Sequence, residues 1–272
     1  MSKKTELAAT SDSLPDYLKG RAPTKPNDNF DNSDVVLPQI KLLQGVSAEC
    51  TTFNDAKSGN FWHNSLDFNL GDALEFVVCS RRKKYLLQAP LDDGQGVLAR
   101  SDDFVTWDKL GSWQIKVDKK TTVEWRIDDL NVEESGLAKW GTFDPSDENS
   151  PPAATLFYEY LVLLPAHLDF GPAVISLARS QIKQAKRGLN NKIALHGSMG
   201  RPMQSLVFKA TSAVESIGNN QDYNTWNFTS NGFASKDVFD TACEFEGSLQ
   251  VYAVKDEEMQ DAKAAPAGST KF

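Results

Sequence analysis

Residues 171–209 read GPAVISLARSQIKQAKRGLNNKIALHGSMGRPMQSLVFK, and this stretch decides how the chain folds. Two apolar runs, residues 172–178 and 204–208, are bounded by Gly, Pro or Ser, as strands usually are. The apolar residues between them recur every three or four positions, which places them on one face of a helix: Ile182, Ala185, Leu189 and Ile193. The stretch therefore predicts a strand, a basic helix, a turn and a second strand.

The predicted helix lies in a local reversal of charge. Seven Lys or Arg residues and no Asp or Glu lie between Phe170 and Val214, although the formal net charge of the chain is -8. Many basic helix faces are simply solvated, but surfaces built only for solubility usually mix both signs. The absence of carboxylates therefore favours a surface that contacts an anion. Its predicted contact residues are Arg179, Lys183, Lys186, Arg187, Lys192 and Arg201.

A second basic cluster follows an apolar strand. Residues 74–79 read LEFVVC and run into four cations that end at Tyr85: Arg81, Arg82, Lys83 and Lys84. With the seven above, they make 11 positive charges, so the rest of the chain carries -19. A cleft of one sign within a body of the other focuses a polyanion onto one track. The acidic total therefore does not exclude nucleic acid, although a uniformly basic domain would indicate it more simply.

Length and composition bound the class of protein. With 272 residues, 40% of them hydrophobic, the chain can form one large domain or two small ones. No apolar run approaches the roughly 18 residues that span a bilayer, and the N-terminus lacks the apolar region of a signal peptide. The three cysteines form no CxxC pair, which argues against a disulfide framework or a structural zinc site. We expect a soluble protein with no membrane partner.

The chain divides into three predicted regions. Residues 1–34 are polar and indicate a flexible arm, residues 35–254 a single β-rich α+β domain, and residues 255–272 an acidic flexible tail. Within the domain we expect a central strand at 154–164, a hairpin within 113–127 and a C-terminal helix from 235 to about 254.

Signatures of catalysis are absent from the sequence. The chain has no GxxxxGK[ST], GxGxxG, HExxH or GxSxG motif, and its three histidines lack metal-ligand spacing. Acid pairs such as Asp92-Asp93 and Asp102-Asp103 could hold Mg²⁺ in a nuclease, but such pairs in polar loops are usually solvated turns. We expect no enzyme activity, no cofactor and no metal, and a metal-dependent nuclease is the least favoured alternative.

Aromatic residues stand beside the cations. Proteins that bind single-stranded nucleic acid combine cations along the phosphates with rings on which bases stack. Tyr85 follows the second basic cluster, and Trp113 and Trp125 lie on the predicted hairpin, which also carries Lys116. Both tryptophans alternate in phase with β-branched residues, so core packing is the alternative for them. Tyr85 is the stronger stacking candidate, because four consecutive cations beside it are not expected to be buried.

These motifs, taken in order, resemble a known family. An apolar strand, the helix SLARSQIKQAKRGLNNKI, the strand GRPMQSLVFKATS and the aromatic segment YNTWNF are similar to bacteriophage single-stranded-DNA-binding proteins of the OB-fold type. The opening LPQIKLLQGVSAEC and SGNFW also resemble uncharacterised phage proteins found among replication and recombination functions. The similarity covers roughly residues 35–230. It implies an OB-like barrel, no catalysis, and a virus-encoded protein in the host bacterial cytoplasm.

The C-terminal tail resembles that family in part. Such proteins end in an acidic peptide that closes on an aromatic residue and docks on replication or recombination partners. The residues that match this pattern are Asp256, Glu257, Glu258, Asp261 and Phe272. The segment 264–271 separates the acids from the terminal Phe, so a plain solubilising terminus is the alternative.

The sequence therefore predicts a non-catalytic single-stranded-DNA-binding protein acting in phage DNA replication or recombination. A phage structural or assembly protein is the alternative, because surfaces of two signs also suit subunit contacts. Whether the two basic segments form one groove, the preference for DNA over RNA and the oligomeric state stay open.

Overall fold

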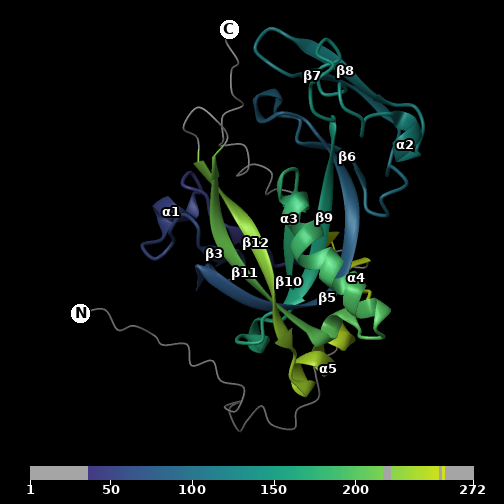
Figure 1. Cartoon of the computed structure of the whole chain (residues 1–272). Coiled ribbons are helices and arrows are strands. Elements are labelled where there is room, and N and C mark those ends of the chain that lie inside the picture. Colours follow the sequence, from purple (N-terminus) through teal and green to yellow (C-terminus); the bar gives the residue numbers. More distant parts are fainter. Residues whose placement is uncertain (1–35, 217–221, 251–252, 255–272) are drawn as a thin grey trace, which may run out of the picture.

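The computed structural model describes residues 36–216, 222–250 and 253–254 (Figure 1). The arm predicted at residues 1–34 and the tail predicted at 255–272 lie outside these residues.

The largest sheet is antiparallel and holds the core. Its strand order is β10 (Ala173–Ala178), β9 (Ala154–Leu163), β5 (Ala73–Gln88), β11 (Leu206–Ser216) and β12 (Asp222–Phe233), and β6 (Val97–Ser101) also pairs with β5. β9 lies between β10 and β5, so the prediction of a central strand is confirmed. Its continuous apolar sequence follows from burial of both its faces in two separate core clusters.

Smaller elements surround this sheet. A three-stranded sheet contains β2 (Ile40–Leu42), β3 (Phe61–His63) and β4 (Phe68–Gly71), and β1 (Val36–Leu37) pairs in parallel with β13 (Ala253–Val254). β7 (Gly111–Lys116) and β8 (Thr122–Ile127) form the predicted hairpin. The short helices are α1 (Glu49–Thr52) and α2 (Val132–Ser135), with single turns at η3 (Leu91–Asp93), η4 (Leu168–Phe170), η6 (Met203–Ser205) and η7 (Ser248–Gln250).

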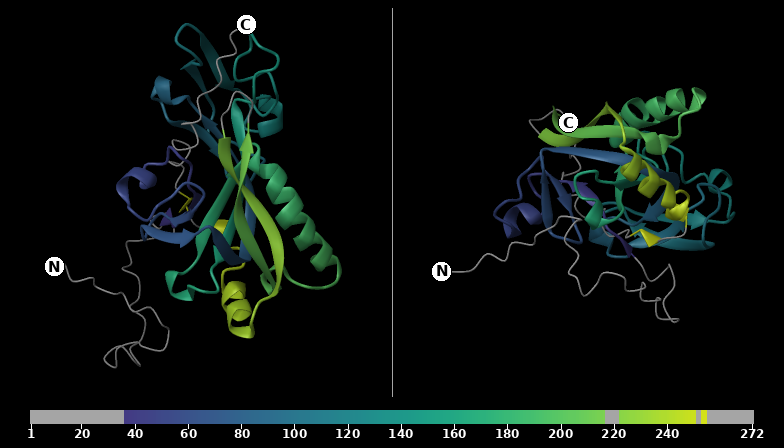
Figure 2. Two further views of the ribbon diagram at one scale, coloured as in Figure 1. Left: turned by 60° about the vertical axis from the view of Figure 1, so that its left-hand side comes forward. Right: turned by 90° about the horizontal axis from the view of Figure 1, so that it is seen from below.

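The predicted basic helix is confirmed and has three parts. α3 (Gln181–Ala185) and α4 (Asn191–Ser198) are joined by η5 (Lys186–Asn190), a π turn. The helix packs on one face of the large sheet, as Figures 1 and 2 show from two sides.

The sheet does not close into a barrel in the part of the chain described. Its edge strands β10 and β12 do not pair, and α3 contacts both of them. β2 also contacts both edge strands. A helix and a strand of the small sheet therefore fill the opening that strand pairing would close in an OB-like barrel. The β-rich α+β class is confirmed, and the OB type is not.

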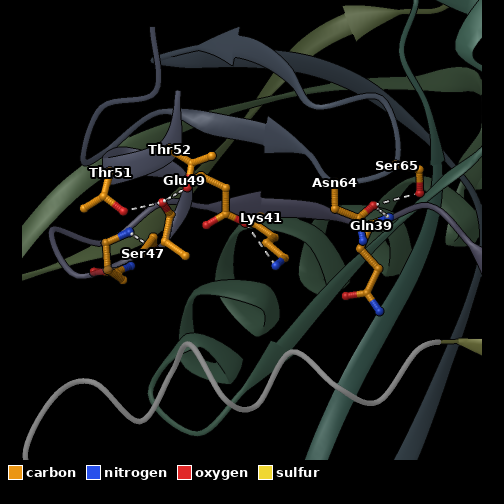
Figure 3. A network of polar contacts seen from close by, with 10 residues as sticks. Gln39, Lys41, Ser47, Glu49, Thr51, Thr52, Asn64 and Ser65 are labelled. Carbon is orange, nitrogen blue, oxygen red and sulfur yellow. Dashed lines mark hydrogen bonds and ion pairs between the residues drawn. The ribbon is translucent and has the colours of Figure 1, made fainter. Parts of the chain in front are cut away.

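Polar contacts fasten the small sheet beside this opening (Figure 3). The backbone N–H of Gln39 donates to Asn64 Oδ1 at 2.7 Å, and Lys41 Nζ lies 3.2 Å from Glu49 Oε1. The first contact ties the residue before β2 to the residue after β3, and the second ties β2 to α1.

The segment between β5 and β9 builds a second core. Trp107, Ile115, Trp125 and Ile127 pack there, in a cluster separate from the main core. Figure 1 shows this lobe, with β7, β8 and α2, above the large sheet.

The C-terminal helix is shorter than predicted. α5 (Lys236–Glu244) ends before Gly247, whose φ of 76° lies in the left-handed region. Residues 253–254 form β13, which pairs with β1. The expected continuation to residue 254 is therefore wrong. No helix among residues 36–216, 222–250 and 253–254 is long and apolar enough to cross a membrane.

Candidate nucleic-acid interface

A glycine lets the basic helix approach the sheet closely. A Cβ at Gly188 would lie 2.5 Å from Phe228 Cβ and 2.8 Å from the Phe228 carbonyl oxygen. Only glycine fits this contact without a shift of helix or strand. The apolar face beside it, which includes Leu189 and Ile193, packs into the main core. The orientation of the helix is therefore fixed by packing.

Side-chain amides cover the outer edge of β12. Gln181 Oε1 accepts from the backbone N–H of Trp226 at 3.1 Å and from Thr225 Oγ1 at 2.9 Å. Gln44 accepts from the N–H of Asn224 at 2.8 Å and donates to its carbonyl at 3.0 Å. An edge strand capped in this way is protected from pairing with another chain. The α3 end of the helix is thereby tied to β12.

The opposite face of the helix is cationic and open. Lys183, Lys186, Arg187 and Lys192 are exposed, as are Arg179 and Arg201 at either side of the helix. The ion pairs within the described ranges involve other cations. In the described part of the chain these cations form no ion pair, although the carboxylate of Glu215 lies against α3 and accepts from Gln184 at 3.0 Å.

The four cations of the second cluster lie inside β5 and do not leave its end as expected. Residues directly opposite in a β ladder share a face, and Arg81 and Lys83 stand opposite Tyr160 and Tyr158. Both tyrosines belong to the core cluster that also contains Leu189 of the helix. Arg81 and Lys83, both exposed, therefore lie on the helix side of the sheet.

One asparagine joins the two basic segments. Arg81 Nη1 donates to Asn190 Oδ1 at 2.8 Å, and the Tyr160 hydroxyl donates to the same oxygen at 3.2 Å. Asn190 ends the π turn, which brings it over β5 and β9. Burial raises the pKa of Tyr160, so its hydroxyl stays a hydrogen-bond donor. The cations of β5 and of the helix thus adjoin on one face.

The other two cations of β5 pair with a buried carboxylate. Glu159 on β9 is fully buried, with Arg82 Nε 2.7 Å from its Oε2 and Lys84 Nζ 2.8 Å from its Oε1. Lys84 is only 2% exposed, and Arg82 also reaches Asp102 at 3.7 Å. A buried carboxylate requires such partners, because an unpaired one would be strongly destabilising. The predictions that Lys84 and Arg82 contact phosphate are therefore corrected.

The predicted stacking residues are only partly accessible. Trp125 is 1% exposed and donates its ring N–H to the Phe143 carbonyl at 3.1 Å, so its predicted contact with a base is wrong. Trp113 is half-buried opposite Trp125, and Lys116 is exposed on the same hairpin. Tyr85 is half-buried against Phe104, with ring centroids 5.0 Å apart and planes 13° apart. Burial raises the pKa of Tyr85.

Comparison with known proteins places the chain in a phage family. The model of the Pam3 phage gp34-like protein family matches residues 4–255. The chain belongs to this family. No curated protein and no solved structure matches the chain. The expectation of a phage protein is confirmed, and binding to single-stranded DNA stays a prediction for this gp34-like protein.

Two exposed rings of the gp34-like protein, Trp140 and Phe233, and one half-buried ring, Phe104, were not predicted. Trp140 is 71% exposed and Phe233 59%, with the Arg201 guanidinium 5.4 Å from the Phe233 ring. Phe104 has Lys83 Nζ at 4.8 Å from its ring. Each is a single aromatic in a polar segment, where no periodic pattern separates an exposed ring from a buried one.

The remaining predicted residues concern partners and metals. Asp256, Glu257, Glu258 and Phe272 lie outside the described residues. In the parts of the chain that the structure describes, no three His, Cys, Asp or Glu side chains gather as a metal site.

Proposed function

We propose that this gp34-like phage protein is a non-catalytic single-stranded-DNA-binding protein that acts in phage DNA replication or recombination in the host cytoplasm. The contact between Arg81 and Asn190 is the observation that carries the proposal. It joins the exposed cations of β5 to those of the helix, whereas the buried pairs that neutralise Arg82 and Lys84 lie on the other face of β5. Such a cationic surface suits a chain of phosphates.

Two rings that stand beside exposed cations favour a single strand over a duplex. Phe104 stands beside Lys83, and Phe233 stands beside Arg201. Unpaired bases can stack on such rings, whereas the bases of a duplex are already stacked on each other. The pairing of cation and ring is the arrangement that a single strand uses.

Charge reversal on the helix tests the proposal. Binding of a labelled oligo-dT is measured by fluorescence anisotropy over a range of salt concentrations. The wild type should bind, with a log-log slope near -0.7 for each phosphate contacted. A variant with Lys183→Glu, Lys186→Glu and Arg187→Glu should lose most of this binding. A matched control, Lys57→Glu, Lys119→Glu and Lys120→Glu, changes the net charge equally at exposed positions elsewhere and should lose little.

Two outcomes would overturn the proposal. Equal loss in both triple variants would mean that only total charge matters, and a wild type without salt-sensitive binding would mean that the surface does not bind DNA. Mass spectrometry of purified virions gives an independent check, since a replication protein should be absent from them. If this protein were a regular component of the virions, the structural or assembly role would be supported instead.

A further inference from the structure

A cavity opens where the pairing of β5 is interrupted. On the edge away from β9, β5 pairs with β11 through residues 73–77 and with β6 through 85–88. Between these ladders, no described strand pairs with this edge. The cavity here has a volume of ≈ 520 Å³, within the range of about 300–1,000 Å³ that holds small ligands. Its lining residues are Arg81, Arg82, Lys83, Asp102, Asp103 and Phe104.

The one ring in this lining is held in a strained conformation. Phe104 has a φ of 70°, a left-handed value that is costly for a bulky residue. Asp103 Oδ1 maintains the turn by accepting from the backbone N–H groups of Val105 at 2.8 Å and Thr106 at 2.7 Å. One side of the cavity is therefore a flat apolar ring, whose position the turn and the stacked Tyr85 both fix.

Two cations in the lining, Arg81 and Lys83, have no carboxylate partner among the described residues. Arg82 is paired with Glu159 and Asp102, and Oδ1 of Asp103 accepts from the backbone of its own turn. Within the described ranges, the contacts of Lys83 Nζ are with two rings, at 4.8 Å from Phe104 and 5.5 Å from Tyr158. Arg81 gives one donor to Asn190 and keeps its other N–H groups. A ligand of this cavity therefore combines an anion with a flat ring.

We infer that the cavity binds one nucleotide, whose base stacks on Phe104 and whose phosphate is held by Arg81 and Lys83. On binding, the Lys83 ammonium moves from the face of the Phe104 ring to the phosphate, and the base stacks on that face in its place. A phosphate alone would not contact the ring of Phe104, and a neutral ring compound would not neutralise Arg81 and Lys83. The inference deepens the proposed function, because it rests on a bound strand to supply the nucleotide and assigns that strand one unstacked base.

A second cavity extends the path beyond Phe104. Its volume is ≈ 390 Å³, and its lining includes Tyr85, Val105 and Lys139. Phe104 lines both cavities and so forms the wall between them. The exposed Trp140 follows Lys139 in the chain. A strand with one base on Phe104 would thus continue past Tyr85 and Lys139.

Calorimetric titration of the full chain with dTMP, thymidine and inorganic phosphate tests the inference. The wild type should bind dTMP more tightly than either fragment. Phe104→Gly removes the ring but accepts the left-handed φ, so the chain should still fold, as its melting temperature will show. It should weaken dTMP binding about tenfold, the loss expected for one stacked base. Phe104→Tyr keeps the ring and should bind as the wild type does. Phe68→Ala, an exposed ring on β4, serves as the matched control.

The outcomes separate this inference from the proposed function. If oligo-dT binds and millimolar dTMP does not, the nucleotide site is overturned and the DNA-binding function stands. Equal dTMP affinity in Phe104→Gly and the wild type, or equal affinity for dTMP and inorganic phosphate, also overturns it. If dTMP binds with the expected dependence on Phe104 while oligo-dT does not bind, the nucleotide site stands and the DNA-binding function fails.

Discussion

Single residues decide which of the cations in β5 are available. Arg82 and Lys84 alternate with Arg81 and Lys83 along the strand, so the pleat sends the two pairs to opposite faces. The sequence predicts this alternation once the strand is recognised. It does not predict which face is buried, because the partner, Glu159, lies on another strand 77 residues from Arg82. The one signal was a carboxylate inside the apolar run ATLFYEYLVLL, which required a buried cation.

His63 makes stability depend on pH. It is 1% exposed, neither of its ring nitrogens has a hydrogen-bond partner among the described residues, and burial lowers its pKa below 6.5. The unfolded chain therefore takes up a proton first as the pH falls. The contribution of neutral His63 is complete above pH 6.5 and is lost as the pH drops through 6.5 toward the lowered pKa of the folded state.

Urea denaturation at pH 7.5 and pH 5.5 checks this expectation. Wild-type stability should fall more than that of His63→Leu over this interval, by at most about 1.4 kcal/mol for each pH unit below the unfolded pKa. The other two histidines are present in both proteins, so their effects cancel. The same pH dependence in both proteins would contradict the assignment.

Among the elements, the basic helix could be predicted best from the sequence. The way it packs on the large sheet could be predicted least. The spacing of Ile182, Ala185, Leu189 and Ile193 fixes a helix and its inner face. The π turn and the contact of Gly188 with Phe228 depend on a strand that comes 40 residues later, so no local pattern reveals them. The edge caps from Gln44 and Gln181 are hidden for the same reason.

Two glycines of this helix should respond oppositely to alanine. Alanine normally favours a helix over glycine by about 1 kcal/mol. At Gly188 the added methyl meets Phe228 at 2.5 Å, so Gly188→Ala should instead destabilise the fold by about 1–3 kcal/mol. A methyl added at Gly197, in α4, would meet no neighbouring atom of the described residues within 4 Å, so Gly197→Ala should be neutral or slightly stabilising. Thermal melting of the two variants compares them directly, and a similar shift in both would show that the close approach is unimportant.

At the scale of the whole molecule, charge is distributed by face. The chain carries -8 overall, yet the helix side of the large sheet gathers the exposed cations of β5 and of the helix. The segregation could be predicted from two acid-free segments, and their meeting could not, because it depends on how β5 and the helix pack. The missing barrel closure has the same origin, since no local pattern says whether β10 and β12 pair or are bridged by a helix.

Two neighbouring lysines test this division. Lys83 is exposed on the helix side, and Lys84 is buried beside Glu159 on the other side. Lys83→Gln should weaken oligo-dT binding and reduce the magnitude of the log-log salt slope by about 0.7, the effect of one phosphate contact. It should barely change the free energy of unfolding. Lys84→Gln should lower that free energy, by less than the about 3–5 kcal/mol expected for a fully broken buried pair, because Arg82 still holds Glu159. It should leave the salt slope of the folded protein unchanged. Since both substitutions remove one positive charge from adjacent positions, a loss of binding in both variants would mean that net charge, and not the face, governs the contact with DNA.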